Sequence, residues 1–176
     1  MTGEVAGLWV IRLLWVHGSP LPMMAAKPSA NPLRELPFFA GLPDTLLWHL
    51  GKLVERRSLA ANELLFKEGD ARQFFGILVK GTIAIEQNRD GSMVQITTLG
   101  AGEAIGEGVL LDDDNHGTQG RATETTDLIY FKKGPLMKLL KDQPAIYAAL
   151  LSRAAKIISA RIKRANLALL ESKRRV

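Results

Sequence analysis

LLFKEGDARQFFGILVKGTIAIEQ, residues 64–87, is the stretch that decides the fold class. It contains three short runs of β-forming residues, at 64–67, 74–79 and 82–87, and the turn residues Glu68-Gly69-Asp70 and Lys80-Gly81 separate them. Strands at this spacing, with no helix between them, are typical of an antiparallel sandwich or roll. The sequence therefore predicts a β-rich core built from short strands.

The same pattern continues on both sides of this stretch. We predict further strands at 55–59, 93–99 and 123–131, with turns at 60–63, 88–92 and 100–103. Before the strands, Asp44 is placed to cap a short amphipathic helix over 45–54. The preceding prolines and the pair Phe38 and Phe39 favour an irregular segment fixed to the core.

Helical periodicity returns after Gly134. A short helix is predicted at 135–141, and Pro144 is suited to start a longer one of about 25 residues, roughly 37 Å in length. Its apolar residues recur every three or four positions as one stripe: Ile146, Leu150, Ala154, Ile157, Ile158, Ile162, Ala165 and Leu169. A small roll cannot cover such a rod, so the far half needs a partner. A parallel helix pair in a homodimer is one candidate, and packing on the N-terminal leader is the other.

These elements predict an α+β fold, a jelly-roll-like antiparallel double-sheet β-roll with a short N-terminal helix and C-terminal helices of which the last is long. We divide the 176 residues into a flexible leader (1–30), the roll (31–142), the long helix (143–172) and a basic tail (173–176). The apolar run at 7–16 is too short to span a membrane. Translation starting at Met23 or Met24 is a further hypothesis for the leader.

Composition limits the chemistry. The chain has no cysteine, which excludes disulfides, thiolate metal ligands and a cysteine nucleophile, and is compatible with the cytoplasm. The net charge of +5 is uneven, because residues 153–176 carry eight basic side chains and one acidic, while residues 1–152 carry 15 basic and 17 acidic. The basic end is either a solvated helix face or a contact for nucleic acid, acidic lipid or an acidic partner.

The sequence LGAGEAIGEGVLL, residues 99–111, has the chemistry of an anion site. Gly106 and Gly108 flank Glu107 and lead into a predicted helical turn at 109–111, whose free amide groups can bind phosphate. Glu107 can accept hydrogen bonds from sugar hydroxyls if it points into the same pocket. The alternative is a sharp turn with a solvated glutamate.

Residues 33–166 resemble the cyclic-nucleotide-binding domain family, which includes catabolite activator protein, protein kinase A regulatory subunits and nucleotide-gated channels. The resemblance is carried by LPFFAGLPDTLLWHL (36–50), by residues 64–87 and by residues 99–111, which match the approach to the family's phosphate-binding cassette. It implies cyclic AMP or cyclic GMP as ligand, no other cofactor, and Glu107 on the ribose. It also places Arg161 near that glutamate, with a solvated helix residue as the alternative.

The chain departs from the family at the far end of the cassette. There the family has an arginine that grips the cyclic phosphate, whereas this chain has His116, Gly117 and Thr118. A protonated His116 would restore part of the charge, since a nearby phosphate raises a histidine pKa. The predicted ligand-binding residues are Gly106, Glu107, Gly108, Val109, His116, Gly117, Thr118 and Arg161.

The resemblance implies a regulatory or sensor module of cytoplasmic signal transduction that is not an enzyme. A metal-dependent enzyme would need clustered histidines, whereas His17, His49 and His116 are scattered. The six residues after Leu170 predict no helix-turn-helix and hence no sequence-specific DNA reading. A roll that has lost its nucleotide and serves as a protein-interaction module remains the alternative, because the phosphate-binding arginine is missing.

Overall fold

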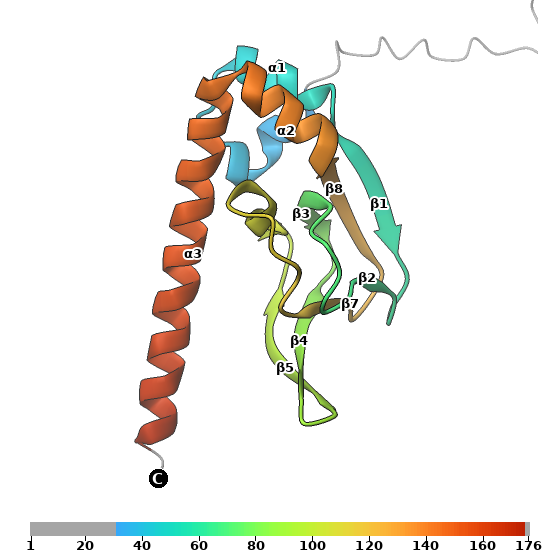
Figure 1. The fold of residues 1–176 in the computed structure, drawn as a ribbon, viewed down its shortest axis with the longest axis vertical. Helices are drawn as coiled ribbons and strands as arrows, with labels where there is room; N and C mark the ends of the chain where they lie inside the picture. The colour runs from blue at the N-terminus through green and yellow to red at the C-terminus, as the bar shows by residue number, and fades with distance from the viewer. Residues whose placement is uncertain (1–30, 175–176) are drawn as a thin grey trace, which may run out of the picture.

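A computed structural model describes residues 31–174 of the chain as a β-roll with helices at one end and one long helix along its side (Figure 1). The predicted leader, 1–30, and the last two residues of the predicted basic tail lie outside the described residues. Within the described part, no helix is both long enough and apolar enough to cross a membrane.

The roll consists of two four-stranded antiparallel sheets. One sheet has the order β1-β8-β3-β6 and the other β2-β7-β4-β5. The strands are β1 (Glu55–Leu59), β2 (Leu64–Phe66), β3 (Phe74–Lys80), β4 (Ile83–Arg89), β5 (Ser92–Leu99), β6 (Ala104–Ile105), β7 (Gln119–Ala122) and β8 (Thr126–Lys132). The predicted α+β double-sheet roll is therefore confirmed.

The strand predicted at 123–131 is wrong at its start. The strand there is β8, which begins three residues later, and the preceding residues 119–122 form β7, a strand of the other sheet that was not predicted. A turn of threonines separates them: Thr126 is fully buried, and its hydroxyl bonds to the carbonyls of Glu124 and Thr82. Hydroxyl side chains bend the backbone here in place of glycine or proline, so the usual turn signal was absent.

Three short 3-10 helices and three α-helices complete the fold: η1 (Pro32–Glu35), η2 (Pro37–Phe39), α1 (Asp44–Gly51), η3 (Glu107–Leu110), α2 (Lys133–Asp142) and α3 (Pro144–Lys173). Asp44 is the first residue of α1 and Pro43 its cap, one position earlier than predicted. The long helix begins at the predicted proline and has 30 residues.

Two clusters of buried apolar side chains stabilise this arrangement. The smaller lies between the two sheets and includes Leu59, Leu78 and Leu128. The larger joins the first sheet to the helices. It contains Phe75 of β3 and Phe131 of β8, together with Phe39 and other side chains of η1, η2, α1, α2 and α3. Phe38 and Phe39 are both buried in it, as predicted for the segment around them. The helical end of the molecule is therefore one continuous packing unit with the roll.

The N-terminal half of α3 is fixed to this core. Ile146, Leu150 and Ala154 are fully buried. Arg153 adds a polar attachment, since its Nε donates to the carbonyl of Phe38 at 2.7 Å and its Nη2 to that of Ala40 at 2.7 Å. Beyond Arg161 every described side chain of α3 is exposed. The helix is thus anchored at one end and runs down beside the roll at the other (Figure 1).

The attachment by Arg153 leads to a stability prediction. Arg153→Met keeps the apolar stem but removes both hydrogen bonds to the carbonyls, and hydrogen bonds from a charged donor contribute about 1.5–3 kcal/mol each. We expect the free energy of unfolding in urea to fall by about 2 kcal/mol or more. Lys156→Met, at an exposed position of the same helix, is the control and should change it by less than about 0.5 kcal/mol. Equal effects of the two substitutions would contradict the attachment.

Candidate functional site

A cavity of about 400 Å³ lies between the second sheet, the turn that follows β6, and α3. Strand side chains such as Phe66, Ile85 and Leu99 form its apolar wall, and Ile158 of α3 closes one side. Most of the predicted ligand-binding residues line it: Gly106, Glu107, Gly108, His116, Gly117, Thr118 and Arg161. Residues of β2, β4, β5, the cassette and α3 therefore meet at one cavity.

Val109 is the exception among the predicted site residues. Its side chain is buried in the larger core cluster and does not line the cavity. The helical turn begins at Glu107, two residues earlier than predicted, so the Val109 amide donates to Gly106 and the Leu111 amide to Gly108. The prediction of free amides is therefore wrong for Val109 and Leu111, which complete the turn itself, while an anion site at this turn stays a prediction.

Gly106 sets the direction of the cassette turn. Its φ of +74° lies in the left-handed region, which costs other residues about 1–2 kcal/mol. A Cβ at this position would also lie 2.5 Å from the carbonyl oxygen of Phe74. The turn can thus pass directly over β3, and this close approach directs Glu107 into the cavity.

Glu107 forms an ion pair with Nη1 of Arg161. The Glu107 side chain is 12% exposed and that of Arg161 26%, so both charges are largely withdrawn from water. Nη2 of Arg161 donates to the carbonyl of Ala104 at 2.6 Å. Arg161 therefore joins α3 to both sides of the cassette turn. It lies beside Glu107, as the resemblance to the family implied. The alternative of a solvated helix residue does not fit this geometry.

His116 is buried against an aromatic ring. Its imidazole stacks on Phe66 with 4.0 Å between ring centroids, and the residue is 8% exposed. Its backbone is fixed as well: the His116 amide donates to Asp70 at 2.8 Å, and the Gly69 amide donates to the His116 carbonyl at 2.7 Å. The loop at the far end of the cassette is therefore tied to the Glu68-Gly69-Asp70 turn.

The environment of His116 favours the neutral imidazole. Burial, followed by the positive charge of Arg72, lowers the pKa of His116 below its ordinary value of 6.5, and the Asp70 carboxylate opposes this. A protonated His116 would have to form against both effects. Its predicted role as a charged phosphate ligand stays a prediction that depends on the phosphate being present.

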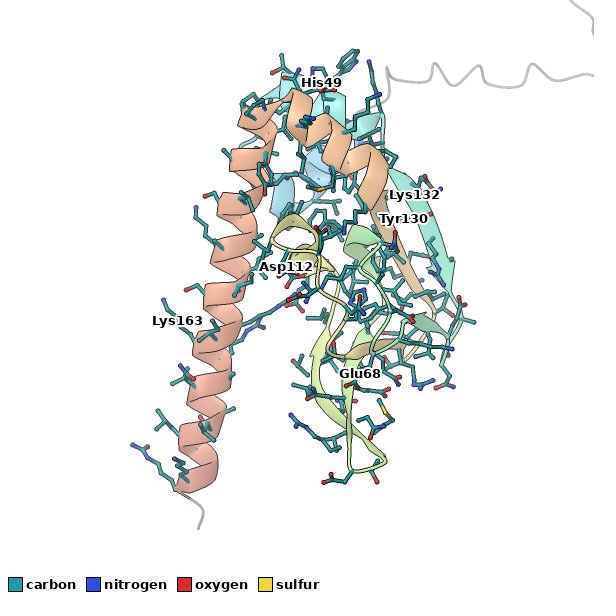
Figure 2. All side chains as sticks on the ribbon, viewed as in Figure 1. His49, Glu68, Asp112, Tyr130, Lys132 and Lys163 are labelled. Carbon is teal, nitrogen blue, oxygen red and sulfur yellow. The ribbon has the colours of Figure 1, made fainter. Side chains whose placement is uncertain are left out.

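Arg72 and Asp112 line the same cavity, and the sequence analysis did not single them out. Their side chains form an ion pair, with Nη1 of Arg72 on the Asp112 carboxylate. Asp112 follows η3 on the side of the roll that faces α3 (Figure 2). The two residues are 40 positions apart, so no local motif connects them, and only the fold brings them together.

A second cavity, of about 450 Å³, lies between α3 and the N-terminal segment, and Arg161 lines both. Its other charged residues include Arg153, Lys156, Glu103 and Arg164, and the last two form an ion pair with 3.4 Å between Arg164 Nη2 and Glu103 Oε1. In residues 31–174, no group of three or more His, Cys, Asp or Glu side chains is placed to hold a metal ion.

Comparison with known proteins identifies the family and supports the fold. A family profile described as "Cyclic nucleotide-binding domain" matches residues 56–143, half of the chain. The chain belongs to the cyclic nucleotide-binding domain family. Its predicted resemblance to that family, stated above from three sequence stretches, is thereby confirmed.

Individual relatives of this cyclic nucleotide-binding domain agree with the profile. A solved cyclic nucleotide-binding domain of Methylobacillus flagellatus is similar with a TM-score of 0.69 and 19% identity, over 80% of this chain and 79% of that one. The Thermus thermophilus catabolite activator protein is similar with a TM-score of 0.62 and 24% identity, over 78% of this chain and 63% of that one. These two likenesses support the fold.

Among curated proteins, the lysophospholipase nte1 of Neurospora crassa is 30% identical over 120 residues, which is 67% of this chain. The chain spans 8% of the length of that relative and also 8% of the lysophospholipase of Chaetomium globosum. The likeness therefore concerns one segment of much longer proteins.

The lowered pKa of His116 gives a prediction for this cyclic nucleotide-binding domain. Between the folded-state pKa and 6.5, the unfolded chain binds a proton that the folded chain does not, so stability should be full above 6.5 and decrease as the pH falls below it. His116→Gln should reduce this loss, measured by urea unfolding at pH 7.5 and 5.5. His49→Gln, remote from the cavity, is the control. A pH dependence identical in all three proteins would contradict the prediction.

Proposed function

We propose that this domain binds a cyclic nucleotide, cyclic AMP or cyclic GMP, in the cavity beneath α3 and acts as a regulatory or sensor module in cytoplasmic signal transduction. The observation that carries the proposal is the meeting of Glu107 and Arg161, since a buried carboxylate from the cassette and a cation from the long helix share the mouth of one cavity. The proposal assigns the chain no catalysis, no other cofactor and no sequence-specific DNA reading.

Glu107 is the proposed ribose ligand. A carboxylate in a largely dehydrated site accepts strong hydrogen bonds from hydroxyl groups. Its partner at present is Arg161, and a ribose hydroxyl would either share the carboxylate with the guanidinium or displace it. The family resemblance assigns the matching glutamate the same contact.

Displacement of Arg161 would change how α3 lies on the roll. The first turns of the helix are anchored by buried side chains and by Arg153, whereas its contact with the cavity depends on Ile158 and Arg161. A ligand that alters the Arg161 contact therefore acts on the distal half of α3 and leaves the anchored half in place. Occupancy would thus be coupled to the position of the free end of the helix.

The proposed ribose contact can be tested by calorimetric titration with cyclic AMP and cyclic GMP. Glu107→Gln removes the charge of the acceptor, and losing a charged hydrogen bond should weaken binding by about 1.5–3 kcal/mol, roughly 10- to 150-fold in Kd. Glu103→Gln is the matched control, because Glu103 also pairs with an arginine of α3 but lines the second cavity. Equal losses in both variants would argue against the proposed contact.

A specific observation also favours the alternative, a protein-interaction module that has lost its nucleotide. His116 and Gly117 stand where the family has its phosphate-binding arginine, and His116 is stacked on Phe66 with its pKa lowered by burial. If neither nucleotide binds the wild-type domain at 1 mM, this alternative replaces the first proposal.

We further propose that the distal half of α3 pairs with a second copy of the chain. Ile162 and Leu170 are 55% and 59% exposed, and burying them against a partner would remove apolar surface from water. This follows the predicted homodimer through the long helix.

Sedimentation velocity at 10–100 µM tests the pairing, in the presence and absence of cyclic AMP. Ile162→Glu should shift the domain toward monomer, because a carboxylate in an apolar helix interface is costly to bury. Lys163→Glu introduces a carboxylate at the adjacent position and should leave the dimer intact. A monomeric wild-type domain under all these conditions would refute the homodimer.

A further inference from the structure

We propose that Arg72, from the loop between β2 and β3, supplies the positive charge that binds the cyclic phosphate in place of the missing cassette arginine. This inference rests on the proposed function, because it names the residue that would hold the anionic part of the same ligand. Arg72 lies outside the cassette in sequence but lines the cavity, and its side chain is 21% exposed.

The backbone holds Arg72 beside the loop from which the family's arginine is missing. The Gly69 amide donates to the carbonyl of His116, the His116 amide donates to the carbonyl of Asp70, and Ala71 forms a β-bridge with Asn115. The residue that follows this bridge is Arg72. Its backbone is therefore positioned against the far end of the cassette by hydrogen bonds that do not involve its own side chain.

The Arg72 guanidinium also lies directly against the cassette turn. A Cβ built on Gly108 would be 2.7 Å from Cζ and Nη1 of Arg72 and 2.9 Å from its Nε. A side chain at position 108 would therefore require the guanidinium to move. Gly108, predicted as a ligand-binding residue, here leaves the space that the arginine occupies.

The guanidinium keeps donors for an anion. Arginine has five N–H groups in a planar fork, and the Asp112 carboxylate accepts from Nη1. Within residues 31–174, neither Nε nor Nη2 of Arg72 forms a hydrogen bond with a side chain or a carbonyl. Asp112 can thus hold the arginine while two donor groups are left for phosphate oxygens, a geometry that arginine suits well.

Two other nearby arginines have most of their donors occupied by protein groups. Arg161 is bound to Glu107 and to the carbonyl of Ala104. Arg121 pairs with Glu86, with 3.2 Å between Nε and Oε2, and donates to the carbonyl of Asn62, and it does not line the cavity. The effect of Arg72 on the pKa of His116 agrees with a positive charge beside that imidazole. Arg161 also lines the cavity and keeps one buried donor, Nε, which has no hydrogen-bond partner within the described residues, whereas Arg72 keeps two donors and lies beside the loop that contains His116.

The test compares Arg72→Gln with Arg57→Gln by calorimetric titration with cyclic AMP, cyclic GMP and adenosine, which lacks the phosphate. Arg57 is a matched control, because it is also paired with one carboxylate, that of Glu63, and lies on β1 away from the cavity. Urea unfolding of both variants confirms that they are folded.

We expect Arg72→Gln to weaken binding of the cyclic nucleotides about 30-fold or more, as for loss of one partner of a desolvated charge pair. Its affinity for cyclic AMP should approach its affinity for adenosine, a change that a merely structural role would not produce. Arg57→Gln should bind like the wild type.

The outcomes separate the two proposals. Tight wild-type binding with equal affinities of Arg72→Gln and Arg57→Gln overturns the role of Arg72 and leaves the proposed function standing. A folded Arg72→Gln variant that prefers cyclic AMP to adenosine as strongly as the wild type also overturns the role of Arg72 and leaves the proposed function standing. A wild-type domain that binds no cyclic nucleotide overturns both.

Discussion

The ion pair between Glu107 and Arg161 connects the long helix to the cassette turn, and the cavity between them depends on it. Both charges are largely removed from water, and removing one partner of such a pair leaves the other without compensation, which is costly. Nη2 of Arg161 also donates to the carbonyl of Ala104 at the start of β6. The position of α3 and the shape of the cassette turn are therefore set together.

This contact is informative because α3 is held so unequally along its length. The buried residues Ile146, Leu150 and Ala154 and the hydrogen bonds of Arg153 fix its first half to the helical end of the roll. Past Arg161, the described part of the helix has no buried side chain. Arg161 stands at the transition between the two halves. A change at the cavity can thus be transmitted to the free half without disturbing the core.

The charges of the cavity are arranged in two pairs, Arg161 with Glu107 and Arg72 with Asp112. Each arginine comes from a distant segment and each carboxylate from the cassette or the residues just after it. In a site of low exposure, such pairing compensates charges that would otherwise be unfavourable. His116, stacked on Phe66, lines the same cavity, and burial together with the positive charge of Arg72 lowers its pKa.

The local patterns in the sequence were sufficient for the double-sheet roll and for the helices at 44–51 and 144–173, because β-alternation and helical periodicity act over a few residues. They failed where the decisive contacts are distant in the chain. The threonine turn before β8 is stabilised by Thr82, the short strand β6 exists because it pairs with β3, and Arg72 meets Asp112 across 40 residues. Val109 was predicted to bind ligand, but its side chain is buried in the core. The cassette turn packs onto β3, and η3 begins at Glu107, earlier than the local sequence predicts. The positions of charged cavity side chains such as Arg72 and Asp112 therefore depend on packing between distant segments, which local sequence patterns cannot predict.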